Sequence, residues 1–212
     1  MKKLTILFLL ISITTAFGQT LKFDIMAKYS TKAKTYSAEN SIYGISTNSN
    51  YFMRVLNSPN GNQTAIIFDL ESFKKHEYNI RETKLKDNSV AIKFVYLNTS
   101  SFTNYDFHST VTSLDYDFEK ISEDNETETV KLILYKDQSK KRIIKNYELK
   151  ILKSEFNLFT LFRFACFQPY KIFTELNYDK PGLVTSCISD DGSKFILTTF
   201  GEANLEVELP NL

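Results

Sequence analysis

The residues able to carry catalytic or metal chemistry are few and widely spaced in this chain. Its two histidines, His76 and His108, lie far apart, and neither has a second histidine or a cysteine near it. A zinc site needs several converging ligands, usually including a closely spaced pair. The sequence also lacks a Gly-x-Ser-x-Gly elbow, a Walker-type phosphate loop and a Gly-x-Gly-x-x-Gly turn. We therefore expect no metal, no cofactor and no enzymatic activity, with a carboxylate pair assembled by the fold as the one open enzymatic alternative.

Cys166 and Cys187 are the two cysteines of the chain, and two interpretations of them stay open. In an oxidising compartment they could form a disulfide, which in the chain-entropy model would stabilise the fold by about 3 kcal/mol. Apolar neighbours, Phe164 and Phe167 beside Cys166 and Val184 near Cys187, equally suit two buried free thiols.

An acidic series runs through residues 115–128. Asp115, Asp117 and Glu119 alternate with apolar residues, which predicts the solvent-facing side of a strand. Calcium would instead need oxygen ligands gathered in one tight loop. We expect the acidic series to pair across strands with the basic group that follows it, Lys136, Lys140, Lys141, Arg142 and Lys145.

Residues 1–18 have the pattern of a secretory signal peptide. Two lysines precede an apolar run over residues 4–13, and Ala16 and Gly18 stand at −3 and −1 of a cut before Gln19. The run is shorter than the roughly 20 apolar residues of a transmembrane helix. We expect a mature chain that begins at Gln19, has no transmembrane segment, and is exported to the periplasm or cell envelope or secreted.

Residues 19–212 are expected to form a single β domain, since single β domains commonly reach about 200–250 residues. Lys and Arg number 26 against 25 Asp and Glu. This balance lacks the basic excess that is typical of nucleic-acid binding. The chain has 18 Phe and 12 Tyr but no Trp, which favours a β-rich core, with an aromatic-lined cavity as the alternative.

Alternation of apolar and polar residues dominates this domain and predicts β-strands. In the first run Leu21, Phe23 and Ile25 share one face, and short polar breaks such as 190–192 are typical of turns between antiparallel neighbours. The fold class we expect is all-β, mainly an antiparallel meander of about ten or more strands, curved into a half-barrel or barrel. Further strand-like runs cover residues 42–47, 51–56, 64–70, 73–80, 90–96, 114–118, 130–134, 143–151, 183–189, 194–200 and 205–209.

One segment has the pattern of a helix instead. Ser154 is a suitable N-cap, Pro169 a suitable stop, and Leu158, Leu161 and Phe162 fall at helical spacing. The segment is apolar nearly all round, which is typical of a buried helix. We expect one short apolar helix over about 154–165, packed on the concave face of the sheet. A structural plug, a movable lid over a ligand cavity and a membrane-surface segment are its three alternative roles.

Several stretches resemble small exported proteins of Bacteroidota-type Gram-negative bacteria: Gly18-Gln19, Phe23-Asp24, Asn50-Tyr51-Phe52 before Ile67-Phe68-Asp69-Leu70, and residues 158–164. The meander with one apolar helix is also similar, more remotely, to the half-barrel carriers of the periplasmic lipoprotein-sorting pathway (LolA/LolB-like). In those families an incomplete barrel holds a helical lid over an apolar cavity that takes acyl chains. The resemblance implies a cavity and a lid.

These observations lead us to expect an exported, non-enzymatic binding protein of the periplasm or cell envelope. Its partner would be an apolar or lipid-like small molecule. The alternative is a structural or protein-interaction module with a filled core, whose partner is another envelope protein. A connected apolar cavity beside the helix would distinguish the two. The side chains expected to line it combine large apolar area with inward direction: Phe94, Tyr96, Leu158, Leu161 and Phe162.

Overall fold

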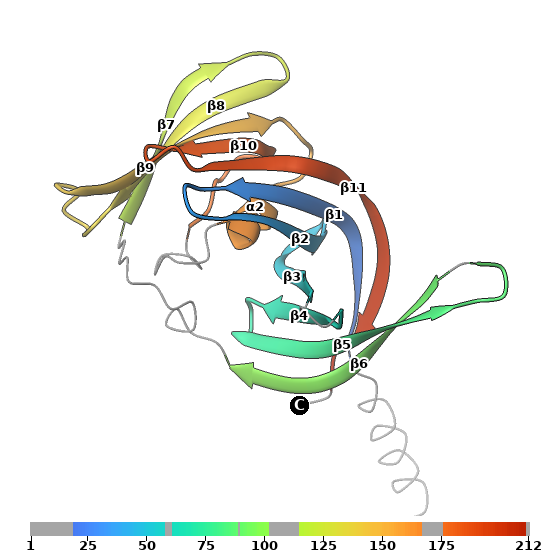
Figure 1. Ribbon diagram of the computed structural model, residues 1–212. Helices are drawn as coiled ribbons and strands as arrows, with labels where there is room; N and C mark the ends of the chain where they lie inside the picture. Colours follow the sequence, from blue (N-terminus) through green and yellow to red (C-terminus); the bar gives the residue numbers. More distant parts are fainter. Residues whose placement is uncertain (1–18, 58–60, 89, 102–114, 167–175, 211–212) are drawn as a thin grey trace, which may run out of the picture.

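The computed structural model describes residues 19–57, 61–88, 90–101, 115–166 and 176–210. The predicted signal peptide and His108 lie outside the described residues. Eleven strands and one helix make up the described chain (Figure 1). Their bounds are β1 Thr20–Lys32, β2 Ser37–Ile45, β3 Asn48–Asn57, β4 Gln63–Asp69, β5 Lys74–Lys84, β6 Val90–Ser101, β7 Asp115–Glu123, β8 Thr127–Tyr135, β9 Ile143–Leu152, α2 Phe159–Cys166, β10 Leu183–Ser189 and β11 Lys194–Glu208.

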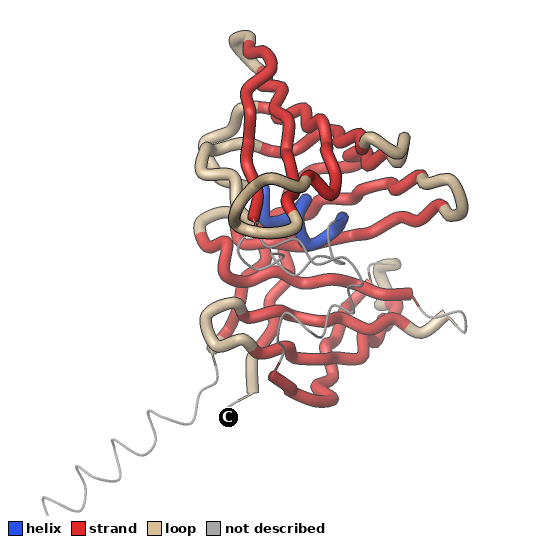
Figure 2. Tube along the Cα trace, turned by 90° about the vertical axis from the view of Figure 1, so that its left-hand side faces the viewer, coloured by secondary structure: helices blue, strands red, loops and turns tan. Residues whose placement is uncertain are grey.

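All eleven strands belong to one antiparallel sheet with the order β6-β5-β4-β3-β2-β1-β11-β10-β9-β8-β7. The predicted all-β meander is therefore confirmed. The first and last strands pair with each other in the middle of the sheet, and β6 and β7 form its two edges. The sheet is strongly curved and not closed, which makes it a half-barrel, and α2 lies inside the curve (Figures 1 and 2). No helix in the described part of the chain is long and apolar enough to cross a membrane.

The sheet buries hydrophobic cores on both of its faces. The first core contains α2 and the inner faces of β8, β9 and β10. The second lies between strands β3 to β5 and the ends of β1 and β11 that extend past β2. In β4, Phe68 belongs to the first core and its neighbour Ile67 to the second, so this strand is buried on both sides.

A bend in the β1–β11 pair makes the second core possible. The pairing register shifts between Phe23 and Ile25, and both strands curve around the molecule there (Figure 1). Beyond this bulge, Phe23 of β1 and Val207 of β11 pack against the second core. The hydroxyl of Tyr78 in β5 donates a hydrogen bond of 2.8 Å to the carbonyl oxygen of Glu208, which joins the end of β11 to β5.

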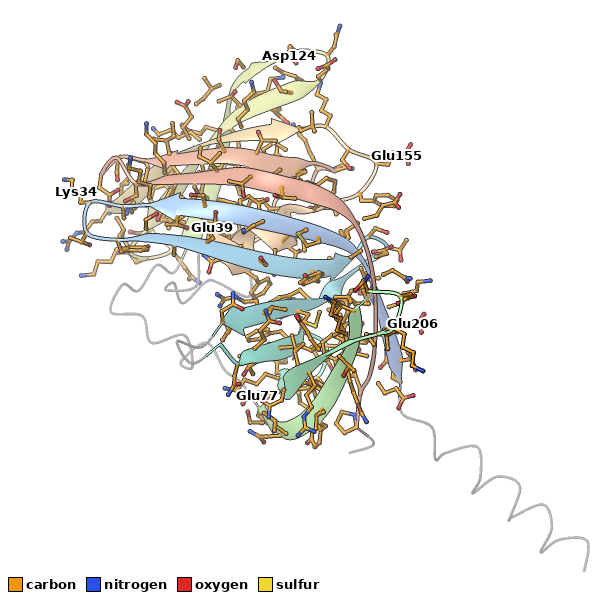
Figure 3. The ribbon with its side chains drawn as sticks, turned by 45° about the vertical axis from the view of Figure 1, so that its right-hand side comes forward. Lys34, Glu39, Glu77, Asp124, Glu155 and Glu206 are labelled. Carbon is orange, nitrogen blue, oxygen red and sulfur yellow. The ribbon has the colours of Figure 1, made fainter. Side chains whose placement is uncertain are left out.

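Charged side chains lie on the outer face of β1 and β2. Lys28 of β1 and Glu39 of β2 form an ion pair of 2.6 Å there, and Glu39 is seen on this face in Figure 3. The predicted pairing of the acidic series with the basic group is confirmed by Lys140, whose Nζ contacts the carboxylates of Asp115 and Asp117.

The helix begins later than the sequence predicts. Ser154 is not its N-cap, because the next residues are held extended against Gly182. The Leu158 amide donates to the Gly182 carbonyl (3.0 Å), and the Gly182 amide donates to the Phe156 carbonyl (2.9 Å). Asn157 marks the helix start instead, since its Oδ1 accepts from the amide of Phe159 at 3.1 Å. The helix therefore covers Phe159–Cys166 rather than 154–165.

Candidate functional site

The five side chains predicted to line a cavity lie in two different places. Leu158, Leu161 and Phe162 are buried together in the first core. Phe94 and Tyr96 lie on the edge strand β6, where their rings contact Tyr78 in the second core, at centroid distances of 6.3 and 5.7 Å.

The concave face is tightly packed where α2 meets the sheet. The Phe164 ring stacks on Phe52 at 3.8 Å, and Phe52 stacks on Phe68 at 4.7 Å. Phe162 makes an edge contact with Tyr29 at 5.5 Å. The free space between α2 and β2 measures about 10 Å³. That is about the space one water molecule needs, and far less than an acyl chain.

The polar groups beneath the helix are occupied by structural hydrogen bonds. The buried guanidinium of Arg163 donates from Nη1 to the Leu176 carbonyl and lies over the Phe164 ring, 4.3 Å from its centroid. Burial lowers the pKa of Arg163 to about 10, so the group remains a cation at neutral pH. The Tyr29 hydroxyl donates to the carbonyl of Val184 at 2.9 Å.

Cys166 and Cys187 are free thiols in the structure. Burial raises the pKa of both thiols well above the usual value. The thiolate is the nucleophilic form of cysteine, and it is suppressed here. Burial outweighs the nearby cations, Arg54 for Cys166 and Lys145 for Cys187, so neither thiol is activated in the way a catalytic cysteine is.

A larger hollow lies on the outer face of strands β7 to β10. This groove has a volume of about 320 Å³. It lies on the outer face because Lys131 and Glu148 alternate along their strands with core residues such as Leu132 and Tyr147. The outer groove is lined by Ile121, Lys131, Asn146, Tyr147, Glu148, Ile188, Ser189 and Asp190.

Strand register explains how these side chains meet. Lys131 of β8 is paired with Glu148 of β9, and Glu148 is paired in turn with Ile188 of β10. Ile121 falls at a register shift of β7, between Lys120 and Ser122. A bulge places an extra residue outside the regular ladder and re-aims its side chain. Ile121 and Ile188 are both exposed and give the outer groove its apolar surface.

Asn146 supplies the unusual polar group of the outer groove. Its backbone is fixed, because its amide donates to Asp190 Oδ2 at 3.0 Å and its carbonyl accepts from the Asp190 amide at 3.1 Å. Within the described chain its side-chain Oδ1 is buried without a hydrogen-bond partner. Leaving a buried acceptor unpaired costs about 1–3 kcal/mol. A partner that donates an N–H or O–H to this oxygen would recover that free energy.

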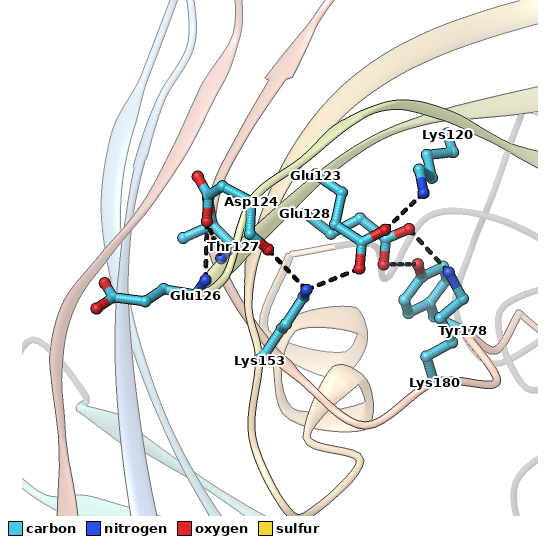
Figure 4. A network of polar contacts seen from close by, with 9 residues as sticks. All are labelled: Lys120, Glu123, Asp124, Glu126, Thr127, Glu128, Lys153, Tyr178 and Lys180. Carbon is cyan, nitrogen blue, oxygen red and sulfur yellow. Dashed lines mark hydrogen bonds and ion pairs between the residues drawn. The ribbon is translucent and has the colours of Figure 1, made fainter.

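A polar network stabilises the neighbouring end of the sheet (Figure 4). The buried carboxylate of Glu128 accepts from the Tyr178 hydroxyl at 2.7 Å and from Lys180 Nζ at 2.8 Å. Lys153 Nζ contacts Glu123 at 2.7 Å and donates to the Asp124 carbonyl at the same distance. The Glu128 contacts attach residues 178–180 to β8, and the Lys153 contacts attach the segment after β9 to the β7–β8 turn. The network therefore has a structural role.

His76 is a further buried polar residue outside the outer groove. Its Nδ1 lies 2.8 Å from Thr99 Oγ1, and its Nε2 has no hydrogen-bond partner among the described residues. Burial lowers the pKa of His76, partly offset by Asp69, so the ring is neutral at pH 7. His76 is paired with Ile67 of β4 on one side and with Thr99 of β6 on the other. It lines neither the outer groove nor the space beneath α2.

Sequence reasoning did not identify the outer groove. One residue could have indicated it from the sequence. Ile121 is an apolar residue between Lys120 and Ser122, in a polar stretch of the acidic series. Within the described residues no group of three or more His, Cys, Asp and Glu side chains could hold a metal ion. Comparison of the chain with models of known protein families and with curated proteins finds no match to either.

Proposed function

We propose that this protein is an exported, non-enzymatic interaction module of the cell envelope, and that its outer groove binds a segment of a partner polypeptide. The export is supported by the signal-like pattern of residues 1–18. The choice of partner rests on the difference in volume between the outer groove and the space beneath α2. Of these two hollows, both lined by described residues, the outer groove offers about 320 Å³ and the space beneath α2 about 10 Å³.

The lining of the outer groove favours a polypeptide over a lipid. Ile121 and Ile188 provide apolar surface for a side chain. The Asn146 oxygen is an unused acceptor that a peptide N–H would pair once the amide turns toward the groove. Lys131 has only a loose ion pair with Glu119, at 4.0 Å, so its ammonium group can turn to a ligand. An acyl chain placed here would cover charged and polar groups without pairing them, which is costly.

Site-specific photo-crosslinking in the intact envelope tests the proposal. A photoreactive residue at position 188 is expected to capture one defined partner protein, and Asn146→Leu in the same chain is expected to reduce that capture at least tenfold. Leu56 of β3 is the matched control position, because its side chain is also 40% exposed and β3 lies four strands from β10 in the sheet. Equal capture of the same partner at 188 and 56 would overturn the assignment of the groove.

Native mass spectrometry of the protein purified from its own envelope tests the competing lipid-carrier function. We expect no lipid adduct. A lipid mass that stays with the wild-type protein and is lost in Phe162→Asp, with a folded circular dichroism spectrum in both, would contradict the interaction-module proposal.

A further inference from the structure

The hairpin of β5 and β6 forms an arm that extends beyond the rest of the sheet (Figure 1). Strand β4 pairs with β5 only as far as Ile80, opposite Gln63. Beyond that point the described part of β5 pairs with β6 alone, through Arg81↔Lys93, Glu82↔Ile92, Thr83↔Ala91 and Lys84↔Val90. We call residues 81–88 and 90–93 the arm. All of them are exposed.

The arm exposes a group of large aliphatic side chains. Leu85 is 48% exposed, Val90 52% and Ile92 45%. Leu85 begins the turn, where the Asn88 amide donates to its carbonyl at 3.1 Å, and Val90 begins the returning strand. A two-stranded hairpin is marginally stable in water, and it gains nothing from leaving aliphatic side chains in solvent. This composition points to a surface that is covered in the working protein.

The arm also concentrates unpaired positive charge. Arg81, Lys84, Lys86 and Lys93 outnumber the two acidic residues of the arm, Glu82 and Asp87. None of the four cations has an ion pair with a described residue. Arg81 and Lys93 are direct cross-strand partners. Like charges placed opposite each other destabilise a hairpin, and a negatively charged partner would reverse that effect.

We propose that the β5–β6 arm docks tip-first on an anionic membrane surface. Leu85, Val90 and Ile92 enter the interfacial layer, and the arginine and the three lysines bind lipid phosphates. The dimensions fit, because the three residue steps from Lys84 to Arg81 span about 10 Å. Apolar faces of interfacial segments are buried to about 5–10 Å. Lys84 and Lys86 flank Leu85 at the tip, while Arg81 and Lys93 reach the headgroups from the base of the arm.

The aliphatic side chains favour a membrane over a soluble polyanion. A nucleic acid or an acidic polysaccharide would pair with the four cations but would leave Leu85 and Val90 exposed to water. An anionic bilayer satisfies both features, since its surface attracts lysine and arginine and its interface takes up aliphatic groups.

Vesicle binding by the full mature chain tests the proposal. We expect co-sedimentation with vesicles that contain phosphatidylglycerol, little or none with pure phosphatidylcholine, and weaker binding as salt is raised. Lys84→Glu combined with Lys86→Glu is expected to weaken binding at least tenfold. The control pair is Lys136→Glu with Lys141→Glu in the β8–β9 turn, which is also exposed and should bind as wild type. Equal binding to both kinds of vesicle, or unchanged binding of the arm variant, would overturn the proposal.

A fluorescence probe measures insertion directly, because the chain contains no tryptophan. Leu85→Trp is expected to shift its emission to the blue on adding phosphatidylglycerol vesicles, whereas Gln138→Trp in the β8–β9 turn should not shift. Heparin serves as the soluble polyanion. If heparin binds wild type and Leu85→Ser equally and no blue shift accompanies vesicle binding, the partner of the arm is a soluble polyanion and the membrane proposal fails. These readouts do not involve the outer groove, so they are independent of the proposed function.

Discussion

Gly44 of β2 lies directly beneath Leu161 of α2. A Cβ atom at position 44 would be 2.6 Å from Leu161 Cδ2, closer than side-chain atoms approach one another. The absence of a side chain at this residue lets the helix rest on the sheet and leaves only about 10 Å³ between them. The position of the helix and the small volume of the space beneath it therefore share one local cause.

We predict that Gly44→Ala destabilises the protein by about 1–3 kcal/mol, the usual cost of overpacking a core. In a Leu161→Ala background the same change is expected to cost much less, because the clashing atom is gone. Urea denaturation of the four proteins in this double-mutant cycle measures the coupling. Additive costs would show that Gly44 does not set the helix position.

His76 should make stability fall below neutral pH. Its folded-state pKa is lowered, first by burial, from an ordinary value of 6.5. Below about pH 6.5 the unfolded chain binds a proton that the folded chain does not, so acid favours unfolding. Above that value the ring is neutral in both states and has no effect. The free energy of unfolding, measured from pH 7.5 to 5, is expected to decline with a slope that His76→Gln reduces. An unchanged slope in this variant would assign the pH dependence to other groups.

Glu123 should titrate far below an ordinary glutamate. Hydrogen bonds from Lys120 and Lys153 lower its pKa to about 2. The depressed value means that the stabilising contacts are complete above about pH 4.5 and are lost as the pH falls toward 2. Carbon-13 NMR titration of the carboxyl group checks this value. Lys153→Gln should move the midpoint upward, whereas Lys150→Gln, three residues earlier at the end of β9, should leave it within experimental error.

Asn146 should exchange stability for binding. Replacing it with leucine removes a buried oxygen that lacks a hydrogen-bond partner among the described residues. We expect the free energy of unfolding to rise by about 1 kcal/mol, while capture of the partner at position 188 is lost. Asn79→Leu is the control, a half-buried position on β5 for which we expect a change within about 0.5 kcal/mol. A destabilised Asn146→Leu protein would show that the side chain has a structural role.

The β-strands were predictable because their signal is local. Alternation along one strand reveals which residues share a face, and Leu183–Ser189 was expected with the same bounds that the structure has. The pairing of the acidic and basic series was also predictable, since Lys140 in the short β8–β9 turn contacts Asp117 on the neighbouring strand β7. Turn residues and short connections then favour an antiparallel meander over other β folds.

Contacts between distant residues decided the rest. The helix begins at Phe159 because Gly182 pairs with the preceding segment, and no local pattern reveals that pairing. Phe94 and Leu161 share an apolar, inward pattern, yet the bend of β1 and β11 sends them to different cores. Sequence alternation specifies a face but not which layer covers it. The curvature of the whole sheet determines that layer, and with it the close packing of α2 on the concave side, the outer groove and the projecting arm.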